Sequence, residues 1–164
     1  MQESKFYQRK IAVIIGTGDL PEQVILGLEK LNITFSVIIF NDITTFHRKN
    51  IKVIDAKFEN IDELFIELET NKFTSIICCG YVPRPQLDLS KMSRASKLIL
   101  EPIIKNFKLG DEAVFRSILS LFDGKGIKPL SIKEIIPELF PVEEFLTDRK
   151  PNLTDCEDAK RANE

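Results

Sequence analysis

The stretch KIAVIIGTGDLP, residues 10–21, decides how the rest of the sequence is interpreted. Its apolar, β-branched run at residues 11–15 is typical of a buried strand of a parallel sheet. A glycine turn follows, and Asp19 and Pro21 stand where a helix would begin. Because Asp caps helix N-termini well and Pro suits the first helical turn, we expect Asp19 to cap a helix here. The stretch therefore predicts a strand, a tight turn and a helix.

Beyond residue 21, apolar runs typical of strands alternate with helical patterns. Strands are predicted at residues 35–40, 51–54 and 74–79, with one more short strand near residues 126–131. Apolar residues recur at helical spacing after Pro21 and in four later segments, the last of which is ended by Pro137: 61–68, 98–106, 110–124 and 132–139. This alternation predicts an α/β fold, a Rossmann-like three-layer domain with a mainly parallel sheet.

The domain is predicted to end near residue 142. From residue 143 onward the apolar pattern fails, and a polar, charged segment interrupted by Pro151 follows. Such a composition is typical of a linker or tail. We therefore divide the chain into a Rossmann-like domain at residues 1–142 and a linker or tail at residues 143–164.

Composition excludes several classes of function. The formal net charge of -2 gives no general attraction to nucleic acid. No apolar run approaches the roughly 20 residues of a membrane-spanning helix, and the first ten residues are polar. The three cysteines lack the spacing of a zinc site, and Cys78 and Cys79 are interpreted as buried apolar residues. We expect a cytoplasmic protein with at most peripheral contact at the inner membrane.

The glycine turn only partly matches a dinucleotide-binding motif. Gly16 and Gly18 fit the pattern GxGxxG, but Pro21 replaces its third glycine. A carboxylate at Asp19 would also occupy the positive end of the helix, where a phosphate would otherwise bind. Two interpretations stay open at this point: a tight turn that needs glycine for its backbone, and one lip of a ligand site.

A second candidate site segment is GYVPRP, residues 80–85. It leaves the carboxyl end of a predicted buried strand, the edge at which parallel sheets bind ligands. We expect it to face residues 16–21 across one crevice. Arg84 stands between two prolines and is suited to a phosphate or a carboxylate. Lys91, Arg94 and Lys97 could add positive charge nearby.

A third segment, GDEAVFRS at residues 110–117, opens a predicted helix. Asp111 is expected to cap this helix, and it could instead reach the crevice. Asp19 and Asp111 are the only two acids that the pattern brings toward a metal, which makes a weak magnesium site. His47, the sole histidine, lies in a polar loop and is interpreted as a surface residue. No nucleophile, base and oxyanion hole come together in the sequence.

These three segments, in this order and spacing, resemble the bacterial UDP-2,3-diacylglucosamine pyrophosphatases of the LpxI type. The resemblance extends from Lys10 to the tail, whose PVEEFLTDRKP is similar to the family's interdomain linker. It implies a role in lipid A biosynthesis, where UDP-2,3-diacylglucosamine is hydrolysed to 2,3-diacylglucosamine 1-phosphate (lipid X) and UMP. The substrate-binding residues that it implies are Gly16, Thr17, Gly18, Asp19, Gly80, Tyr81, Val82, Arg84, Gly110 and Asp111.

The resemblance covers only the N-terminal half of that family. Its C-terminal domain, which carries the principal catalytic acid and most of the magnesium site, has no counterpart in these residues. We therefore expect binding of UDP-2,3-diacylglucosamine or lipid X with little or no hydrolysis, no catalytic residue in this chain, and magnesium only in the full-length family. Expected partners are the missing domain or a second copy, which would cover apolar residues near the linker: Phe140, Phe145 and Leu146.

Two alternatives to the lipid-binding hypothesis stay open. One is a stand-alone nucleotide- or sugar-phosphate-binding module without catalysis. The other is an α/β scaffold whose exposed cleft binds a protein partner. Affinity for free UMP without affinity for lipid X would favour the first, and the absence of small-molecule binding would favour the second.

Overall fold

The computed structural model describes residues 9–40, 43–85, 87–140 and 150–162. Five strands form one sheet in the order β3-β2-β1-β4-β5, and every neighbouring pair is parallel. The strands are β1 (Ile11–Ile15), β2 (Phe35–Phe40), β3 (Lys52–Ala56), β4 (Ser75–Cys79) and β5 (Lys128–Pro129). The chain winds outward from β1 in both directions, which is the Rossmann-like arrangement. The predicted fold class is confirmed.

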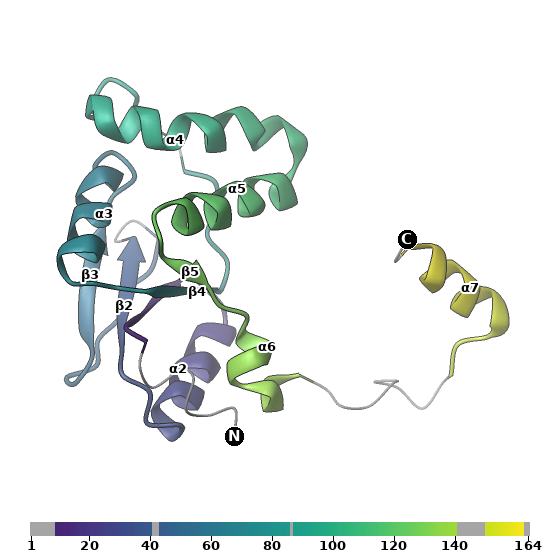
Figure 1. Cartoon of the computed structure of the whole chain (residues 1–164). Helices are drawn as coiled ribbons and strands as arrows, with labels where there is room; N and C mark the ends of the chain where they lie inside the picture. Colours follow the sequence, from purple (N-terminus) through teal and green to yellow (C-terminus); the bar gives the residue numbers. More distant parts are fainter. Residues whose placement is uncertain (1–8, 41–42, 86, 141–149, 163–164) are drawn as a thin grey trace.

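Helices cover both faces of the sheet, as Figure 1 shows. The face formed by Ile11, Val13 and Ile15 packs in one core with α2 (Leu20–Lys30) and α6 (Ile132–Ile135). The face formed by Ala12 and Ile14 packs in a second core with three helices: α3 (Ile61–Thr70), α4 (Arg94–Asn106) and α5 (Asp111–Gly124). Short 3-10 turns follow α4 and α6, as η1 (Phe107–Leu109) and η2 (Pro137–Leu139).

Three local predictions about caps and helix ends are wrong. Asp19 does occupy the N-cap position of α2, but its backbone angles are helical and its side chain makes no capping hydrogen bond. Asp111 is already the first residue of α5, because Gly110 takes the N-cap position with φ 100°. In contrast, α4 begins at Arg94, earlier than predicted, because Ser93 accepts a hydrogen bond from the Ser96 amide and caps it.

The predicted tail also contains a helix, α7 (Leu153–Ala162), none of whose residues is buried. Asn152 and Asp155 exchange hydrogen bonds between side chain and backbone, which stabilises the first turn. The linker residues Phe145 and Leu146 lie outside the described residues. The domain boundary near residue 142 stays a prediction.

A partly buried polar contact joins α3 to α4. The carboxylate of Asp62 at the start of α3 accepts hydrogen bonds from the hydroxyls of Ser93 (3.1 Å) and Ser96. Ser96 is fully buried, so its hydroxyl needs a partner inside the protein. The Ser96 and Ser93 hydroxyl bonds lower the pKa of Asp62 below its ordinary value. This contact fixes the position of α4 over the sheet.

Replacing Asp62 by Asn should lower the free energy of unfolding at neutral pH, because an amide cannot accept both hydroxyl bonds as a carboxylate does. The lowered pKa means that the ionised carboxylate adds stability above its unfolded-state pKa, roughly 4. That contribution is lost as the pH falls through the folded-state pKa. We therefore expect the stability gap between wild type and Asp62→Asn, measured by urea unfolding, to close as the pH falls from about 6 to about 3.

Glu69→Gln is the matched control, because Glu69 is an exposed acid at the other end of α3. It should leave stability almost unchanged across the same pH range. A gap for Asp62→Asn that did not depend on pH would contradict the role given to the carboxylate.

Candidate functional site

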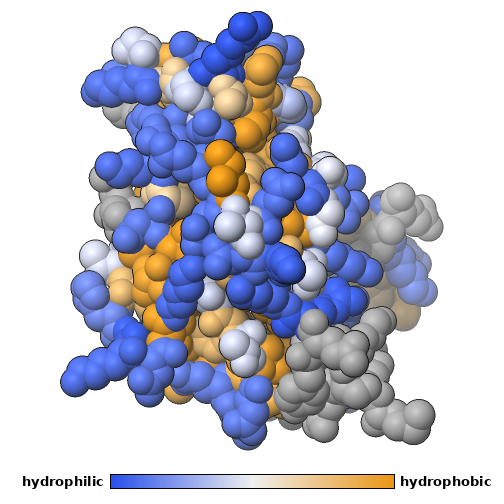
Figure 2. All heavy atoms as spheres, turned by 60° about the vertical axis from the view of Figure 1, so that its left-hand side comes forward, coloured by the Kyte–Doolittle hydropathy of each residue, from blue (hydrophilic) through white to orange (hydrophobic). Residues whose placement is uncertain are grey.

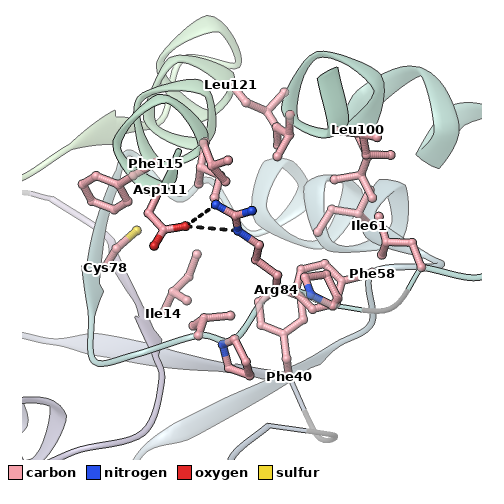
Figure 3. Close-up of a pocket in the computed structure, with 18 of the residues that line it drawn as sticks. Ile14, Phe40, Phe58, Ile61, Cys78, Arg84, Leu100, Asp111, Phe115 and Leu121 are labelled. Carbon is pink, nitrogen blue, oxygen red and sulfur yellow. Dashed lines mark hydrogen bonds and ion pairs between the residues drawn. The ribbon is translucent and has the colours of Figure 1, made fainter. Parts of the chain in front are cut away.

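An apolar cavity of about 590 Å³ lies between the sheet and the helices α3, α4 and α5. Its sheet side is formed by side chains near the carboxyl ends of three strands, Ile14, Phe40 and Cys78. The helices contribute mainly aliphatic and aromatic side chains, among them Ile61, Leu100, Phe115 and Leu121 (Figure 3). The volume is in the range of sites that hold small molecules.

The cavity exists because α5 does not close against the sheet. Although residues 110–124 show an apolar helical pattern, Phe122 is the only buried residue of α5. Val114, Ile118 and Leu121 are half-buried, and they line the cavity instead. The space-filling view in Figure 2, turned to bring the α3 side forward, shows apolar side chains reaching the surface between charged ones. The α3–α5 layer thus leaves room for an apolar guest.

Arg84 joins the strand-end segment to the helical layer. Its Nε and Nη2 atoms donate to one oxygen of Asp111, Oδ1, at 3.1 and 2.5 Å, and its Nη1 donates to the Phe107 carbonyl at 3.0 Å. The guanidinium also lies 5.8 Å from the centre of the Phe107 ring. Pro83 and Pro85 restrict the backbone on both sides. In Figure 3 the guanidinium points toward Asp111 among the lining side chains.

The turns after β1 and β4 do not face each other across a crevice, contrary to the prediction. They bond directly to one another: Gly16 N donates to Cys79 O, and Thr17 and Tyr81 exchange two backbone hydrogen bonds of 2.8 Å each. β1 and β4 are paired in parallel up to Ile15 and Cys79, and beyond the strand ends Thr17 and Tyr81 form an isolated antiparallel bridge. The two turns are therefore in direct backbone contact at the carboxyl edge of the sheet.

Glycine is required where these two turns meet. A Cβ at Gly16 would lie 2.3 Å from the Tyr81 carbonyl oxygen, and Gly80 has a φ of 84°, which L-residues rarely adopt. The close approach explains both glycines without any ligand. Gly18 also has a positive φ, of 104°, in the tight turn that leads into α2.

The structure separates the predicted site residues into two groups. One group lines the cavity: Gly80, Tyr81, Val82, Arg84 and Asp111. The other does not line it: Gly16, Thr17, Gly18 and Asp19 at the β1 turn, and Gly110 at the start of α5. Most apolar lining residues went unpredicted as site residues, because only the packing of α3, α4 and α5 brings them together. The only indication of them in the sequence was the apolar face of the helix at residues 110–124, which was interpreted as part of the core.

The two neighbouring thiols are not suited to nucleophilic chemistry. Burial raises the pKa of Cys78 to about 12, and burial together with the neighbouring Cys78 raises the pKa of Cys79 to about 12. Both thiols therefore stay protonated near neutral pH. Cys79 is buried and Cys78 half-buried, which agrees with their interpretation as small apolar residues.

Other charged groups lie apart from Arg84 in contacts of their own. Lys91 pairs with Asp88 at 3.2 Å, and His47 is exposed on a loop, as expected. Within the described ranges, no group of three or more His, Cys, Asp or Glu side chains could hold a metal ion. Asp111, one of the two acids considered for magnesium, is instead paired with Arg84. None of the described helices combines the length and the apolar character needed to cross a membrane.

Comparison with known proteins gives one family match. The model of the LpxI N-terminal domain matches residues 10–139. No curated protein matches the chain. Similar solved structures include the crystal structure of the Bordetella bronchiseptica enzyme WbmG in complex with NAD and UDP, at 14% identity and a TM-score of 0.42. That similarity covers 71% of this chain and 34% of the other, so this chain spans well under two thirds of that relative.

Gly16→Ala should lower the free energy of unfolding by about 1–3 kcal/mol, the usual range for an overpacked site. The added methyl group would collide with the backbone of Tyr81, which cannot move without breaking its hydrogen bonds to Thr17. Gly124→Ala is the control, because it meets no atom within 4 Å and lies at the end of α5. Urea unfolding of both variants checks this, and equal stability of the two would contradict the assigned role of Gly16.

Proposed function

Because this chain belongs to the LpxI N-terminal domain family, we propose that it is the substrate-binding half of a UDP-2,3-diacylglucosamine hydrolase in lipid A biosynthesis. The full enzyme would cleave the pyrophosphate to give lipid X and UMP. The observation that carries the proposal is the apolar cavity with a single arginine at its polar side. A diacylated sugar phosphate has the same two parts, hydrocarbon and phosphate.

The cavity is suited to an acyl chain. Its lining is made of aliphatic and aromatic side chains from β1, β2, α3, α4 and α5, and the two thiols that line it are neutral. Transfer of a hydrocarbon chain from water into such a lining is favourable, at roughly 25 cal/mol for each Å² buried. An apolar cavity without polar partners also holds water poorly. This lining therefore favours a hydrocarbon ligand.

Arg84 supplies the matching anion site. Its side chain is about half exposed, 48%, so a phosphate can approach from solvent while the hydrocarbon lies inside. The planar guanidinium can form two parallel hydrogen bonds to phosphate. The flanking prolines and the Phe107 carbonyl hold it beside the cavity. The guanidinium thus lies beside the apolar cavity, so that an amphiphile could place its phosphate at Arg84 and its hydrocarbon chain in the cavity.

Catalysis is proposed to depend on groups outside the described residues. The resemblance implies magnesium for the full-length family, but the described acids do not form a donor set for it. We therefore assign no metal-assisted step to this chain. The groups that contact the cavity can bind and orient a ligand, and the isolated chain is expected to release little or no UMP.

The chain should bind lipid X in isothermal titration, with an affinity that Arg84→Gln lowers about tenfold or more. The loss follows from removing a charged hydrogen-bond donor, worth roughly 1.5–3 kcal/mol. Arg116→Gln is the control, because Arg116 is an exposed arginine of α5 that pairs only locally, with Glu112 at 2.6 Å. UMP release from UDP-2,3-diacylglucosamine with magnesium should stay at background.

Three results would contradict parts of this proposal. Clear UMP release would place catalytic groups within these 164 residues. Binding of UMP without lipid X would favour a nucleotide-binding module. No binding of either ligand would favour the protein-partner scaffold.

Filling the cavity gives a second test, independent of the phosphate. Val114→Phe should lower the affinity for lipid X at least about tenfold, because the larger ring takes the volume of several methylene groups, each worth about 0.8 kcal/mol on burial. Leu98→Phe is the matched control, because Leu98 lies on α4, is exposed and does not line the cavity. Equal lipid X affinity of the two variants would exclude the cavity as the acyl site.

A further inference from the structure

The arginine proposed to bind phosphate already has an anionic partner in this structure. Both Arg84 donors that would meet a phosphate, Nε and Nη2, point at Asp111 Oδ1. The third contact, from Nη1 to the Phe107 carbonyl, is to a neutral group on a different element. An incoming anion could therefore replace Asp111 while the Phe107 contact keeps the guanidinium in place.

Asp111 is placed so that it can give up this bond. Its side chain is 89% exposed, and the bonds that it accepts from Arg84 both go to one oxygen, Oδ1. Released from Arg84, it would be hydrated by water, and its position at the first residue of α5 favours a negative charge. An exposed ion pair of this kind is weak and screened by salt. The pair is thus one that a phosphate, with two negative charges and three oxygens, can displace.

We propose that Asp111 is an internal counter-ion that competes with the ligand's phosphate for Arg84. This inference rests on the proposed function of the same site and adds a residue that sets its selectivity and its release. An amphiphile with a phosphate headgroup binds by exchange with Asp111. A neutral amphiphile enters the cavity without breaking the pair and gains nothing from Arg84. Asp111 therefore weakens binding of anionic ligands alone, which favours their release.

The matched neighbour Glu112 makes the proposal testable. It is the next residue of α5, it is also largely exposed (78%), and it pairs with Arg116 rather than Arg84. Asp111→Asn and Glu112→Gln each remove one negative charge from the same helical turn. They differ in whether the charge removed faces Arg84.

The experiment is isothermal titration of wild type, Asp111→Asn and Glu112→Gln with dodecyl phosphate and with dodecanol, both below the concentrations at which they aggregate. Asp111→Asn should bind dodecyl phosphate about three- to fivefold more tightly than wild type, the size expected for loss of one exposed ion pair. The gain should shrink in high salt. Affinity for dodecanol should not change, and Glu112→Gln should match wild type with both probes.

Several results would overturn the proposal. Unchanged or weaker binding of dodecyl phosphate by Asp111→Asn would show that Asp111 does not compete. An equal gain in affinity for dodecanol would show that the substitution merely opens the cavity. An equal gain in affinity for dodecyl phosphate in Glu112→Gln would show that the effect comes from the net charge of the helical turn and not from competition for Arg84. No saturable binding of dodecyl phosphate by any of the proteins would also exclude it. A gain with dodecyl phosphate alongside no binding of lipid X would keep this inference and reject the proposed substrate.

Discussion

The backbone pairing of β1 with β4 is the constraint on which the site depends. It continues past Ile15 and Cys79 into the exchange of hydrogen bonds between Thr17 and Tyr81. This contact holds the chain at Tyr81, and three residues further on Arg84 reaches Asp111 at the start of α5. Without this pairing, the strand end that carries Arg84 would not be held beside the cavity.

The apolar part and the polar part of the candidate site are built by different kinds of structure. The apolar part is made by side chains of helices that pack incompletely, with α5 contributing one buried residue, Phe122, and several half-buried ones. The polar part is held by backbone and proline. Because α5 leaves apolar side chains only half-buried, the free protein lacks the stability that their full burial would give. Such a loss of stability is common at binding sites. A bound hydrocarbon chain would recover part of it.

Much of the fold could be predicted from the sequence, because buried parallel strands such as IAVII and FSVIIF have a strong local pattern. The caps were less predictable. Asp19 and Asp111 are both good capping residues by type, yet Gly110 takes the cap of α5 and Asp111 pairs with Arg84, which is 27 residues away. The helix at residues 153–162 was missed because its polar surface lacks a buried face, although Asn152 and Asp155 form a recognisable cap.

Only the part of the candidate site that lies within one short segment of sequence could be predicted. Arg84 between two prolines is visible in the sequence, whereas the cavity needs residues as far apart as Ile14 and Phe122. The prediction that the two glycine turns form a crevice failed for a further reason: backbone pairing leaves almost no mark on side-chain identity. Its only trace is the pair of glycines, which a ligand-binding loop would also need.

The chemistry of the cavity supports binding more than bond cleavage. Hydrolysis of a pyrophosphate requires a group that activates water and groups that neutralise the charge developing on the phosphate oxygens. Among the described lining residues, Arg84 can neutralise charge, while burial keeps the thiols of Cys78 and Cys79 protonated. The carboxylate of Asp111 could act as a base only when it is free of Arg84. Phosphate binding at Arg84 would free it, but would also place two negative charges close together, and their repulsion weakens binding of the phosphate. The balance of these two charges makes Asp111 better placed to control how long a phosphate stays than to activate water.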